Sequence, residues 1–412
     1  MSDKEQSLIP FSPPRMDQKI IDAVNDTLRS GWITTGPKTK KLEKEIAKYV
    51  AVPKVYCVSS GSAGLELMLR WYGVGEGDEV ILPAYTYAAT ANVIVHTGAK
   101  PVFVDINDDF NIDIEDIRSH ITSKTKVIMP VDIGGFPADY DQINALVQSP
   151  EMRSIFVANN THQKNLGRIL ILSDAAHSLG AEYKTKKAGS LTDITVFSFH
   201  AVKNLTTAEG GAICLNLPSN FNLDEIYTEL NIKSLHGQTK DALAKTQIGN
   251  WRYDIVEAGY KFNMTDISAS MGLVELERYE SDMLVKRKYV FDRYKKGLEK
   301  YSWAQIPSYE TETKKSSFHV FMLRIRMVSE VDRDTIIKKI FSKNVSVNVH
   351  FFPLPMTTYY RNAGYSIADT PMAFSEYARE ISLPVFYDLT DTQIDRVINA
   401  VVEAVESVLK SK

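Results

Sequence analysis

Short apolar runs alternate with amphipathic segments through the first half of the chain. Seven runs rich in β-branched residues predict strands, and they span residues 55–58, 79–82, 101–105, 126–130, 169–173, 194–199 and 211–215. Between them, apolar residues recur at helical spacing and predict helices over residues 64–71, 89–96, 114–120 and 140–147. Strands that alternate with helices in this way form mainly parallel sheets. The pattern therefore predicts an α/β fold built on one large sheet of seven strands.

Helical patterns flank this region. Apolar residues at helical spacing within residues 20–28 and 42–49 predict a helical arm ahead of the first strand. Beyond the seventh strand the strand rhythm stops, and one long helical pattern covers residues 265–299, with Thr265 or Asp266 as its cap.

The last third of the chain repeats the α/β pattern on a smaller scale. We expect a strand at residues 320–326, a helix at 333–342, a strand at 345–350 and a terminal helix at 392–409. Within the first half, a long polar stretch at residues 149–168 predicts an insertion loop. We therefore predict an N-terminal arm or flank over residues 1–50, a large domain over 51–280 and a smaller C-terminal α/β domain over 281–412.

The composition excludes several classes of protein. Of the 412 residues 44% are apolar and 24% are charged, which is typical of globular chains and not of disordered or fibrous ones. The 48 basic and 51 acidic side chains disfavour nucleic acid as a partner. The first residues are polar and no run of about 18 apolar residues occurs, so we expect a cytoplasmic protein without a membrane span. Cys57 and Cys214 lie in apolar runs and predict buried packing residues, so neither a disulfide nor a metal site is expected.

Small residues at positions 59–64 form a candidate phosphate-binding turn. The turn lies between a predicted strand and a predicted helix, where small side chains let a phosphate approach the free N–H groups of the helix. An ordinary strand-to-helix turn has the same composition, so the turn alone does not decide. Neither GxGxxG nor GxxxxGK followed by Ser or Thr occurs in the chain, so NAD and ATP lack their usual signatures.

Two charged residues follow apolar strands further along. Asp174 stands at the carboxyl end of a predicted strand, the edge where open α/β sheets place ligands, although an isolated Asp more often caps a helix. A lone Lys is usually a surface residue, but Lys203 lies between two apolar strands, where desolvation would make its amine a nucleophile. A phosphate cradle, an acid and a lysine, in this order, are the groups that pyridoxal phosphate requires.

These segments resemble the DegT/DnrJ/EryC1/StrS family of sugar aminotransferases, within the fold type I pyridoxal-phosphate enzymes. The resemblance spans nearly the whole chain. Besides the segments of Asp174 and Lys203, it is carried by GWITTGP at 31–37, GEGDEV at 75–80, PAYTY at 83–87, GYKFNMTD at 259–266 and VHFFP at 349–353. It implies the fold type I architecture and the cofactor pyridoxal phosphate, in its pyridoxal and pyridoxamine forms.

The resemblance also implies roles for single residues. Lys203 would bind the cofactor covalently and then move a proton between substrate and cofactor. Asp174 would face the pyridine nitrogen and favour its protonated form. His177, where many relatives carry Gln, would bond the ring oxygen, and Tyr87 would stack on the ring. As bare sequence features, His177 and Tyr87 would more often be packing residues.

For the phosphate, the resemblance implies Ser62 and Ala63 through the turn, the hydroxyl of Ser198, and Asn263 from a neighbouring subunit. An Asn263 that crosses between subunits implies a homodimer with shared active sites. The residues alone favour a simpler role for Asn263, at the start of the long helix.

Family members transfer an amino group, usually from glutamate, to a keto carbon of a nucleotide-linked sugar. Residues 31–37 resemble the subset that acts at C4 of UDP-linked keto sugars, in lipid A, glycan and capsule pathways, more than the C3 subset that acts on dTDP sugars. Thr34, Thr35 and His350 would contact the substrate, although loop or strand packing explains each of them equally well.

Two other activities share this architecture. A pyridoxal-phosphate sugar dehydratase has the same scaffold, but those relatives carry His where this chain has Lys203. A non-catalytic ligand-binding descendant is the second, since a fold never proves turnover. Intact Lys203, Asp174 and Ser198 argue against it.

Overall fold

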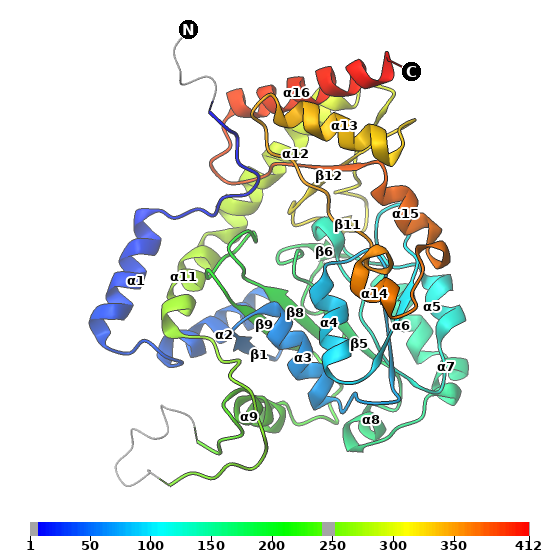
Figure 1. Ribbon diagram of the computed structural model, residues 1–412. Helices are drawn as coiled ribbons and strands as arrows, with labels where there is room; N and C mark the ends of the chain where they lie inside the picture. The colour runs from blue at the N-terminus through cyan, green and yellow to red at the C-terminus, as the bar shows by residue number, and fades with distance from the viewer. Residues whose placement is uncertain (1–6, 241–251, 412) are drawn as a thin grey trace.

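The computed structural model of the protein describes residues 7–240 and 252–411. At its centre lies a seven-stranded sheet in the order β1-β9-β8-β5-β4-β2-β3 (Figure 1). In chain order its strands are β1 (Lys54–Val58), β2 (Glu79–Pro83), β3 (Lys100–Val104), β4 (Thr125–Ile128), β5 (Leu170–Asp174), β8 (Ile194–Ser198) and β9 (Gly211–Leu215). Strand β9 is antiparallel to β1 and β8, and the other neighbours are parallel. The predicted α/β fold with a mostly parallel sheet is confirmed.

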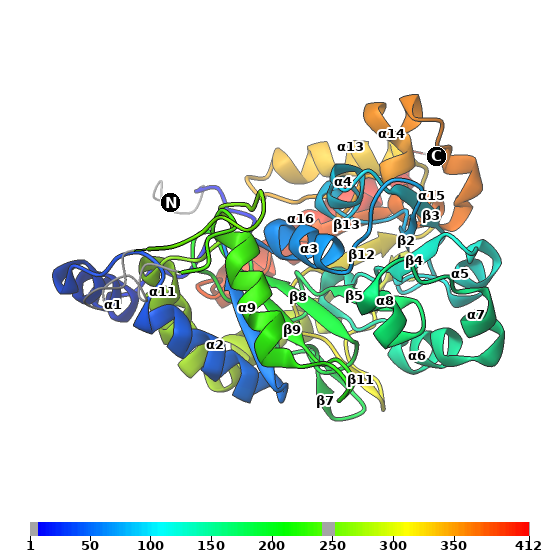
Figure 2. The same ribbon diagram turned by 90° about the horizontal axis from the view of Figure 1, so that it is seen from below.

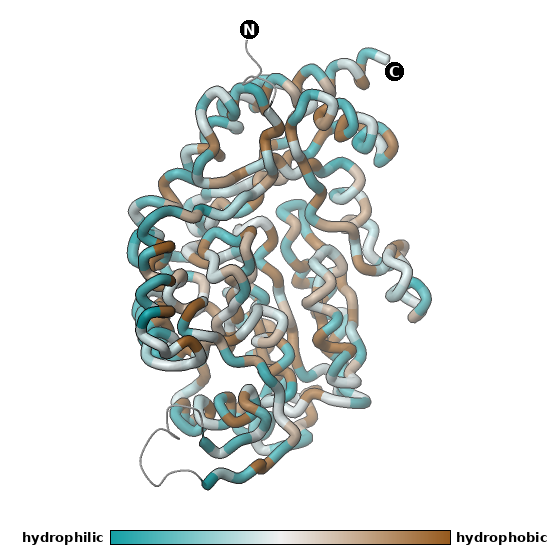
Figure 3. The backbone as a smooth tube through the Cα atoms, turned by 60° about the vertical axis from the view of Figure 1, so that its left-hand side comes forward, coloured by the Kyte–Doolittle hydropathy of each residue, from teal (hydrophilic) through white to brown (hydrophobic). Residues whose placement is uncertain are grey.

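Two layers of helices cover the large sheet. One face packs against α3 (Gly61–Trp71), α4 (Ala88–His96) and α9 (Leu223–Ser234). The opposite face packs against α2 (Pro37–Val50), α5 (Ile114–His120) and α6 (Tyr140–Gln148). Successive side chains of each strand point to opposite faces of the sheet. Leu170 and Leu172 of β5 therefore pack on the face covered by α3, and Ile171 packs on the opposite face. Figure 2 shows the sheet between these layers, and Figure 3 shows hydrophobic residues running through the interior.

The C-terminal part of the chain forms a second, antiparallel sheet in the order β10-β12-β13. Its strands are β10 (Ala304–Gln305), β12 (Phe321–Ile325) and β13 (Glu380–Leu383). The long helices beside it are α12 (Leu284–Leu298), α13 (Glu330–Phe341) and α16 (Asp391–Leu409) (Figure 1). Shorter elements are α14 (Thr358–Asn362), α15 (Pro371–Tyr377) and a third sheet of β11 (Lys314–Lys315), β6 (Glu182–Tyr183) and β7 (Lys186–Lys187). The domain boundaries near residues 50 and 280 stay a prediction.

Both cysteines are buried free thiols in neighbouring strands, which confirms them as packing residues. Within residues 7–240 and 252–411, no helix has the length and apolar character needed to cross a membrane.

The prediction of an insertion loop at residues 149–168 is wrong. The segment folds into two short helices, α7 (Pro150–Ile155) and α8 (Thr161–Leu166). Each helix has a side-chain cap, because Ser149 accepts from Met152 N and Asn160 accepts from Gln163 N. The polar residues that suggested a loop are in part these caps.

The prediction of a single long helix over residues 265–299 is also wrong. Helix α11 (Asp266–Glu277) is separated from α12 by a wide π turn at Tyr279–Met283. The turn directs the buried Tyr279 hydroxyl to the carbonyl of Leu179, at 2.8 Å. The predicted cap is confirmed, since the Thr265 side chain accepts from Ser268 N.

The strand expected at residues 345–350 does not form. Its alternating pattern is that of a strand, but only isolated bridges occur, between Ile9 and Val345 and between Asn348 and Ser382. Strand β13, which the sequence pattern did not reveal, takes the place beside β12 instead. Helices α1 (Gln18–Ser30) and α2 confirm that the chain ahead of the first strand is helical, and its role as a separate arm or flank stays a prediction.

The side chain of Asp266 links helix α11 to the start of helix α2. Although Asp266 is the first residue of α11, its buried carboxylate caps α2 by accepting from the N–H groups of Gly36, Lys38 and Thr39 at 2.8–3.0 Å. One carboxylate thus satisfies three of the orphan donors at the start of a helix.

We predict that Asp266→Asn lowers the free energy of unfolding by about 2 kcal/mol, because an amide NH₂ group would face backbone donors that it cannot satisfy. Urea unfolding followed by tryptophan fluorescence measures the change. Asp224→Asn is the matched control, since in the described part of the chain that exposed side chain pairs with Lys54 alone, and the change should alter stability by less than about 0.5 kcal/mol. Equal stabilities of the two variants would contradict the capping role.

Candidate active site

The carboxyl ends of β1, β2, β5 and β8 meet at one edge of the large sheet, because β9 runs against both β1 and β8 and so leaves those two strands parallel. The segments that follow these strands line a cavity of about 420 Å³. The predicted site residues that line it are Ser62, Tyr87, Asp174, His177, Ser198, Lys203 and His350. Open α/β sheets place ligands at this edge.

Lys203 is held by a closed loop between β8 and β9. The N–H of Phe199 donates to the carbonyl of Gly210 at 2.8 Å, and the N–H of Thr207 donates to the carbonyl of Phe199 at 2.9 Å. Within the loop, the N–H of Lys203 donates to the carbonyl of His200 at 2.9 Å. The four residues after Lys203 are buried. The backbone is therefore anchored on both sides of the lysine.

Asp174 ends β5 and is 7% exposed. Its Oδ2 accepts from the hydroxyl of Thr90 at 2.8 Å, and its Oδ1 accepts from the N–H of Ala176 at 3.2 Å. The hydroxyl of Thr90 also lies 2.8 Å from that of Thr86. Two donors thus fix the orientation of the carboxylate at the cavity wall.

Burial opposes the charges of both groups. It lowers the pKa of Lys203 to about 8, although the negative charge of Asp174 favours the protonated amine. Burial also raises the pKa of Asp174, against the hydrogen bond from Thr90, the N–H of Ala176 and the attraction of Lys203. Among the described residues, no hydrogen bond or ion pair engages the Lys203 amine. The cavity therefore contains an amine that is neutral in a large fraction of molecules near pH 8.

Two histidines in the cavity wall have defined tautomers. Nδ1 of His177 accepts from the N–H of Gly134 at 3.3 Å, so the neutral ring carries its proton on Nε2. Nδ1 of His319 lies 2.7 Å from Oδ1 of Asn204, whose amide donates to the carbonyl of Ser317, so this ring carries its proton on Nδ1. The ring centres are 4.4 Å apart, and burial lowers the pKa of both rings well below the usual value.

The turn after β1 brings a helix N-terminus to the same cavity. A Cβ at Gly211 would lie 2.7 Å from the backbone nitrogen of Gly61, so only glycine allows this close approach of the turn to β9. Ser60 caps α3 by accepting from Ala63 N at 3.0 Å, so the N–H of Ala63 is already engaged. The N–H groups of Gly61 and Ser62 belong to the first turn and have no partner within the helix.

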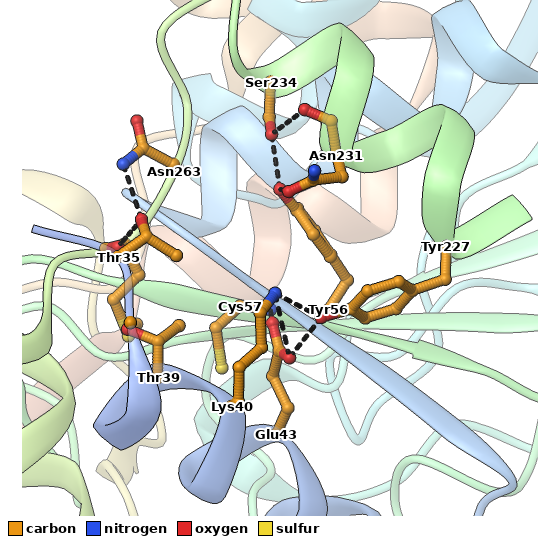
Figure 4. Close-up of polar contacts among 12 residues, drawn as sticks. Thr35, Thr39, Lys40, Glu43, Tyr56, Cys57, Tyr227, Asn231, Ser234 and Asn263 are labelled. Atoms are coloured by element: carbon orange, nitrogen blue, oxygen red, sulfur yellow. Dashed lines mark hydrogen bonds and ion pairs between the residues drawn. The ribbon is translucent and has the colours of Figure 1, made fainter. Parts of the chain in front are cut away.

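Four predicted site residues do not line this cavity: Thr34, Thr35, Ala63 and Asn263. Figure 4 shows Asn263 directed at Thr35, whose hydroxyl accepts from the Asn263 amide at 2.7 Å. The carbonyl of Thr34 accepts from the N–H of Asp266 at 3.1 Å. Within one chain, these contacts support the loop between α1 and α2.

Sequence reasoning missed several residues of the cavity. Phe351 lies in the VHFFP segment at 349–353 and Glu209 lies in the loop of Lys203, so their proximity in sequence to His350 and Lys203 was the available signal. Phe11 and His319 come from the N-terminal segment and from the chain just before β12. They carry no local motif, and only the fold brings them to the site.

Together these groups permit a specific chemistry. A neutral lysine amine attacks carbonyl groups, a buried carboxylate stabilises a facing cation, and free helix N–H groups beside the Ser198 hydroxyl bind a phosphate. A phosphorylated heterocyclic aldehyde matches all three features.

Known proteins extend this picture. The model of the DegT/DnrJ/EryC1/StrS aminotransferase family matches residues 14–402. The spore coat polysaccharide biosynthesis protein SpsC of Bacillus subtilis is 35% identical over 415 residues, covering 98% of this chain and 99% of SpsC. The UDP-4-amino-4-deoxy-L-arabinose–oxoglutarate aminotransferase of Shewanella sediminis is 34% identical, with 96% of this chain and 98% of that protein covered.

A solved structure agrees over almost the whole chain. Spr1654 of Streptococcus pneumoniae, in its pyridoxamine-phosphate form, matches with a TM-score of 0.93 and 47% identity, over 97% of this chain and 100% of that one. The same protein is also solved in its pyridoxal-phosphate form. Pyridoxal phosphate, the expected cofactor, is thus confirmed as the cofactor of the family. The chain belongs to the DegT/DnrJ/EryC1/StrS aminotransferase family.

Proposed function

We propose that the protein moves an amino group from glutamate to the C4 keto carbon of a UDP-linked keto-deoxy sugar, in the synthesis of cell-surface polysaccharide or glycan sugars. The observation that carries the proposal is the amine of Lys203, which has a pKa of about 8, has no hydrogen-bond partner among the described residues, and lies in a cavity beside the carboxylate of Asp174.

The cavity offers pyridoxal phosphate three attachment points. Lys203 would bind the aldehyde carbon, and Asp174 would bind the pyridine nitrogen. The phosphate would accept hydrogen bonds from the N–H groups of Gly61 and Ser62 and from the hydroxyl of Ser198. When bound, the cofactor supplies a carbonyl that exchanges amines and a ring that withdraws electrons from the carbon that loses a proton.

The residues of the chain would supply binding and proton transfer. With cofactor and substrate bound, Lys203 would accept the proton from the substrate carbon and later return it, because burial favours its neutral amine. Asp174 would keep the pyridine nitrogen protonated, because a facing cation favours the ionised carboxylate. His177 carries a proton on Nε2 and so can donate a hydrogen bond to the ring oxygen. The exposed Tyr87 would cover the ring.

The substrate assignment rests on two supports. Residues 31–37 resemble the C4 subset of the family, and the Shewanella sediminis relative acts on UDP-4-amino-4-deoxy-L-arabinose. Thr34, Thr35 and Asn263 lie outside the cavity of their own chain, so we propose that two copies pair and that these residues serve the partner's cavity. His350 would contact the sugar from the chain's own side.

We predict that Lys203→Ala removes the shift to longer wavelength that the absorbance of pyridoxal phosphate undergoes on binding to the wild-type protein, because no other lysine among the described residues lines the cavity. Absorbance spectra before and after cofactor addition, with circular dichroism to check folding, provide the measurement. Lys186→Ala, which changes an exposed lysine outside the cavity, is the control and should keep this shift. A folded Lys203→Ala protein that still shifts the absorbance of the cofactor to longer wavelength would overturn the assignment.

Covalent attachment of pyridoxal phosphate should also depend on pH. Only the neutral amine attacks, so the rate rises as pH increases through the Lys203 pKa of about 8. Because the charge of Asp174 raises that pKa, Asp174→Asn should shift the midpoint to lower pH. Stopped-flow absorbance over the range around pH 8 tests both points. A midpoint near the ordinary lysine value of 10.5, or an upward shift in the variant, would be incompatible with a desolvated amine beside a carboxylate.

We predict that the enzyme aminates UDP-linked 4-keto sugars with glutamate at least about tenfold more efficiently, by kcat/KM, than dTDP-linked or 3-keto sugars, a difference of about 1.4 kcal/mol in transition-state binding. A coupled assay of 2-oxoglutarate formation over the four substrate classes measures it. A preference for 3-keto substrates would reject the C4 assignment while leaving the aminotransferase activity intact.

A further inference from the structure

Three polar side chains form a chain of hydrogen bonds that leads to the cavity from the interior of the β10-β12-β13 sheet, called the small sheet below. Oε1 of Glu380 accepts from the hydroxyl of Ser382 at 2.5 Å, and Oγ of Ser382 lies 2.9 Å from Nδ1 of His350. Oε2 of Glu380 accepts from the backbone N–H of His350 at 3.1 Å. Glu380 and Ser382 are completely buried, whereas His350 lines the cavity and its ring stacks on Phe11.

The far ring nitrogen of His350 is the end of this chain. Among the described residues, no hydrogen bond engages its Nε2. Nδ1 and Nε2 lie on opposite sides of an imidazole ring, so a ring held at Nδ1 by Ser382 offers Nε2 to the cavity that His350 lines.

For a neutral His350 ring, donor and acceptor rules allow only two arrangements of protons. The backbone N–H of His350 can only donate, so Oε2 of Glu380 always accepts and any carboxyl proton sits on Oε1. With Glu380 protonated, Oε1 donates to Ser382, Ser382 donates to Nδ1, and the neutral ring carries its proton on Nε2. With Glu380 ionised, Ser382 donates to Oε1, Nδ1 donates to Ser382, and Nε2 presents a lone pair.

We propose that Glu380, Ser382 and His350 form one proton relay, through which the buried carboxyl of Glu380 exchanges its proton with an oxygen atom of the substrate at Nε2 of His350. In this step the Nε2 proton moves to the substrate oxygen, the Ser382 proton moves to Nδ1, and the Glu380 proton moves to Ser382. One proton is released and Glu380 is left ionised. The identity of the substrate, a keto sugar, rests on the proposed function.

The surroundings allow Glu380 to change its charge near neutral pH. Burial raises its pKa to about 8, although Ser382 and the His350 N–H favour the ionised form. Of the facing groups, Arg333 of α13 donates to the Glu380 carbonyl, Arg324 of β12 pairs with Glu376 of α15, and Tyr85 donates to the carbonyl of His350.

His350 alone could not serve as an acid at neutral pH. Burial, aided by the charge of Lys203, lowers its pKa to about 4, so the ring is neutral and holds a single proton. Burial also keeps His177 and His319, two of the other histidines that line the cavity, neutral. The relay therefore gives the cavity a proton donor with the acidity of Glu380, and the ionisation belongs to the three residues together. Below pH 8 Nε2 donates to a keto oxygen, and above it Nε2 accepts from a hydroxyl.

Nitrogen NMR of the full-length protein labelled with ¹⁵N-histidine tests the relay without any turnover. His350→Asn assigns the signals of this ring among the eight histidines. On raising the pH through about 8, we expect Nε2 to change from protonated to unprotonated and Nδ1 to change in the opposite sense. Spectra taken with and without pyridoxal phosphate separate this result from the proposed function, because the relay does not require the cofactor.

Variants locate the group that titrates. In Glu380→Gln the amide oxygen must face the His350 N–H, so the NH₂ group donates to Ser382 and the ring should keep its Nε2 proton at every pH. Ser382→Ala breaks the link and should also abolish the transition, which keeps the test valid if Glu380→Gln does not fold. Glu376→Gln, which alters a carboxylate of similar burial that does not contact His350, is the control and should retain the transition. A ring that does not change tautomer in the wild type, or an unaltered transition in Glu380→Gln, would overturn the proposal.

Discussion

The removal of two opposite charges from water at one sheet edge is the constraint on which the site depends. The same burial lowers the pKa of Lys203 to about 8 and raises that of Asp174, so neither group is an ordinary surface ion. Their mutual attraction offsets only part of this cost. The cavity therefore contains a reactive amine and a carboxylate that gains from a cationic partner, and these are the two properties that a covalently bound pyridine cofactor uses.

The fold maintains this arrangement by anchoring the backbone on both sides of Lys203, and not by pairing the Lys203 amine with another side chain. The loop of Lys203 is closed at its base and buried beyond the lysine, and Thr90 orients Asp174 from α4. The small sheet adds a second wall. His319, whose tautomer is fixed by Asn204, lies just before strand β12 of this sheet, and strand β13 holds Ser382 against His350. The large sheet thus supplies the covalent chemistry, and the small sheet supplies neutral histidines whose donors and acceptors are set from behind.

Local sequence signals predicted the parts of the site that follow strands. The seven strands of the large sheet were predicted because each is an apolar run, and Asp174 and Lys203 were recognisable because each stands at or after the end of such a run. Ala63 could not be judged from sequence, since its N–H is engaged by the cap Ser60. The strand expected at residues 345–350 failed because alternation shows only that a segment fits a sheet, not that a neighbour is available to pair with it. Glu380 carries no local signal, because its role depends on contacts with His350, thirty residues away.

Peptide mapping of the protein after incubation with pyridoxal phosphate and reduction with borohydride identifies the lysine that binds the cofactor. We predict one stable adduct, on the peptide that contains Lys203, and its loss when glutamate is added before the reduction. An adduct on a different lysine, or no adduct in a protein that binds the cofactor, would contradict the assignment of Lys203 as the covalent attachment point.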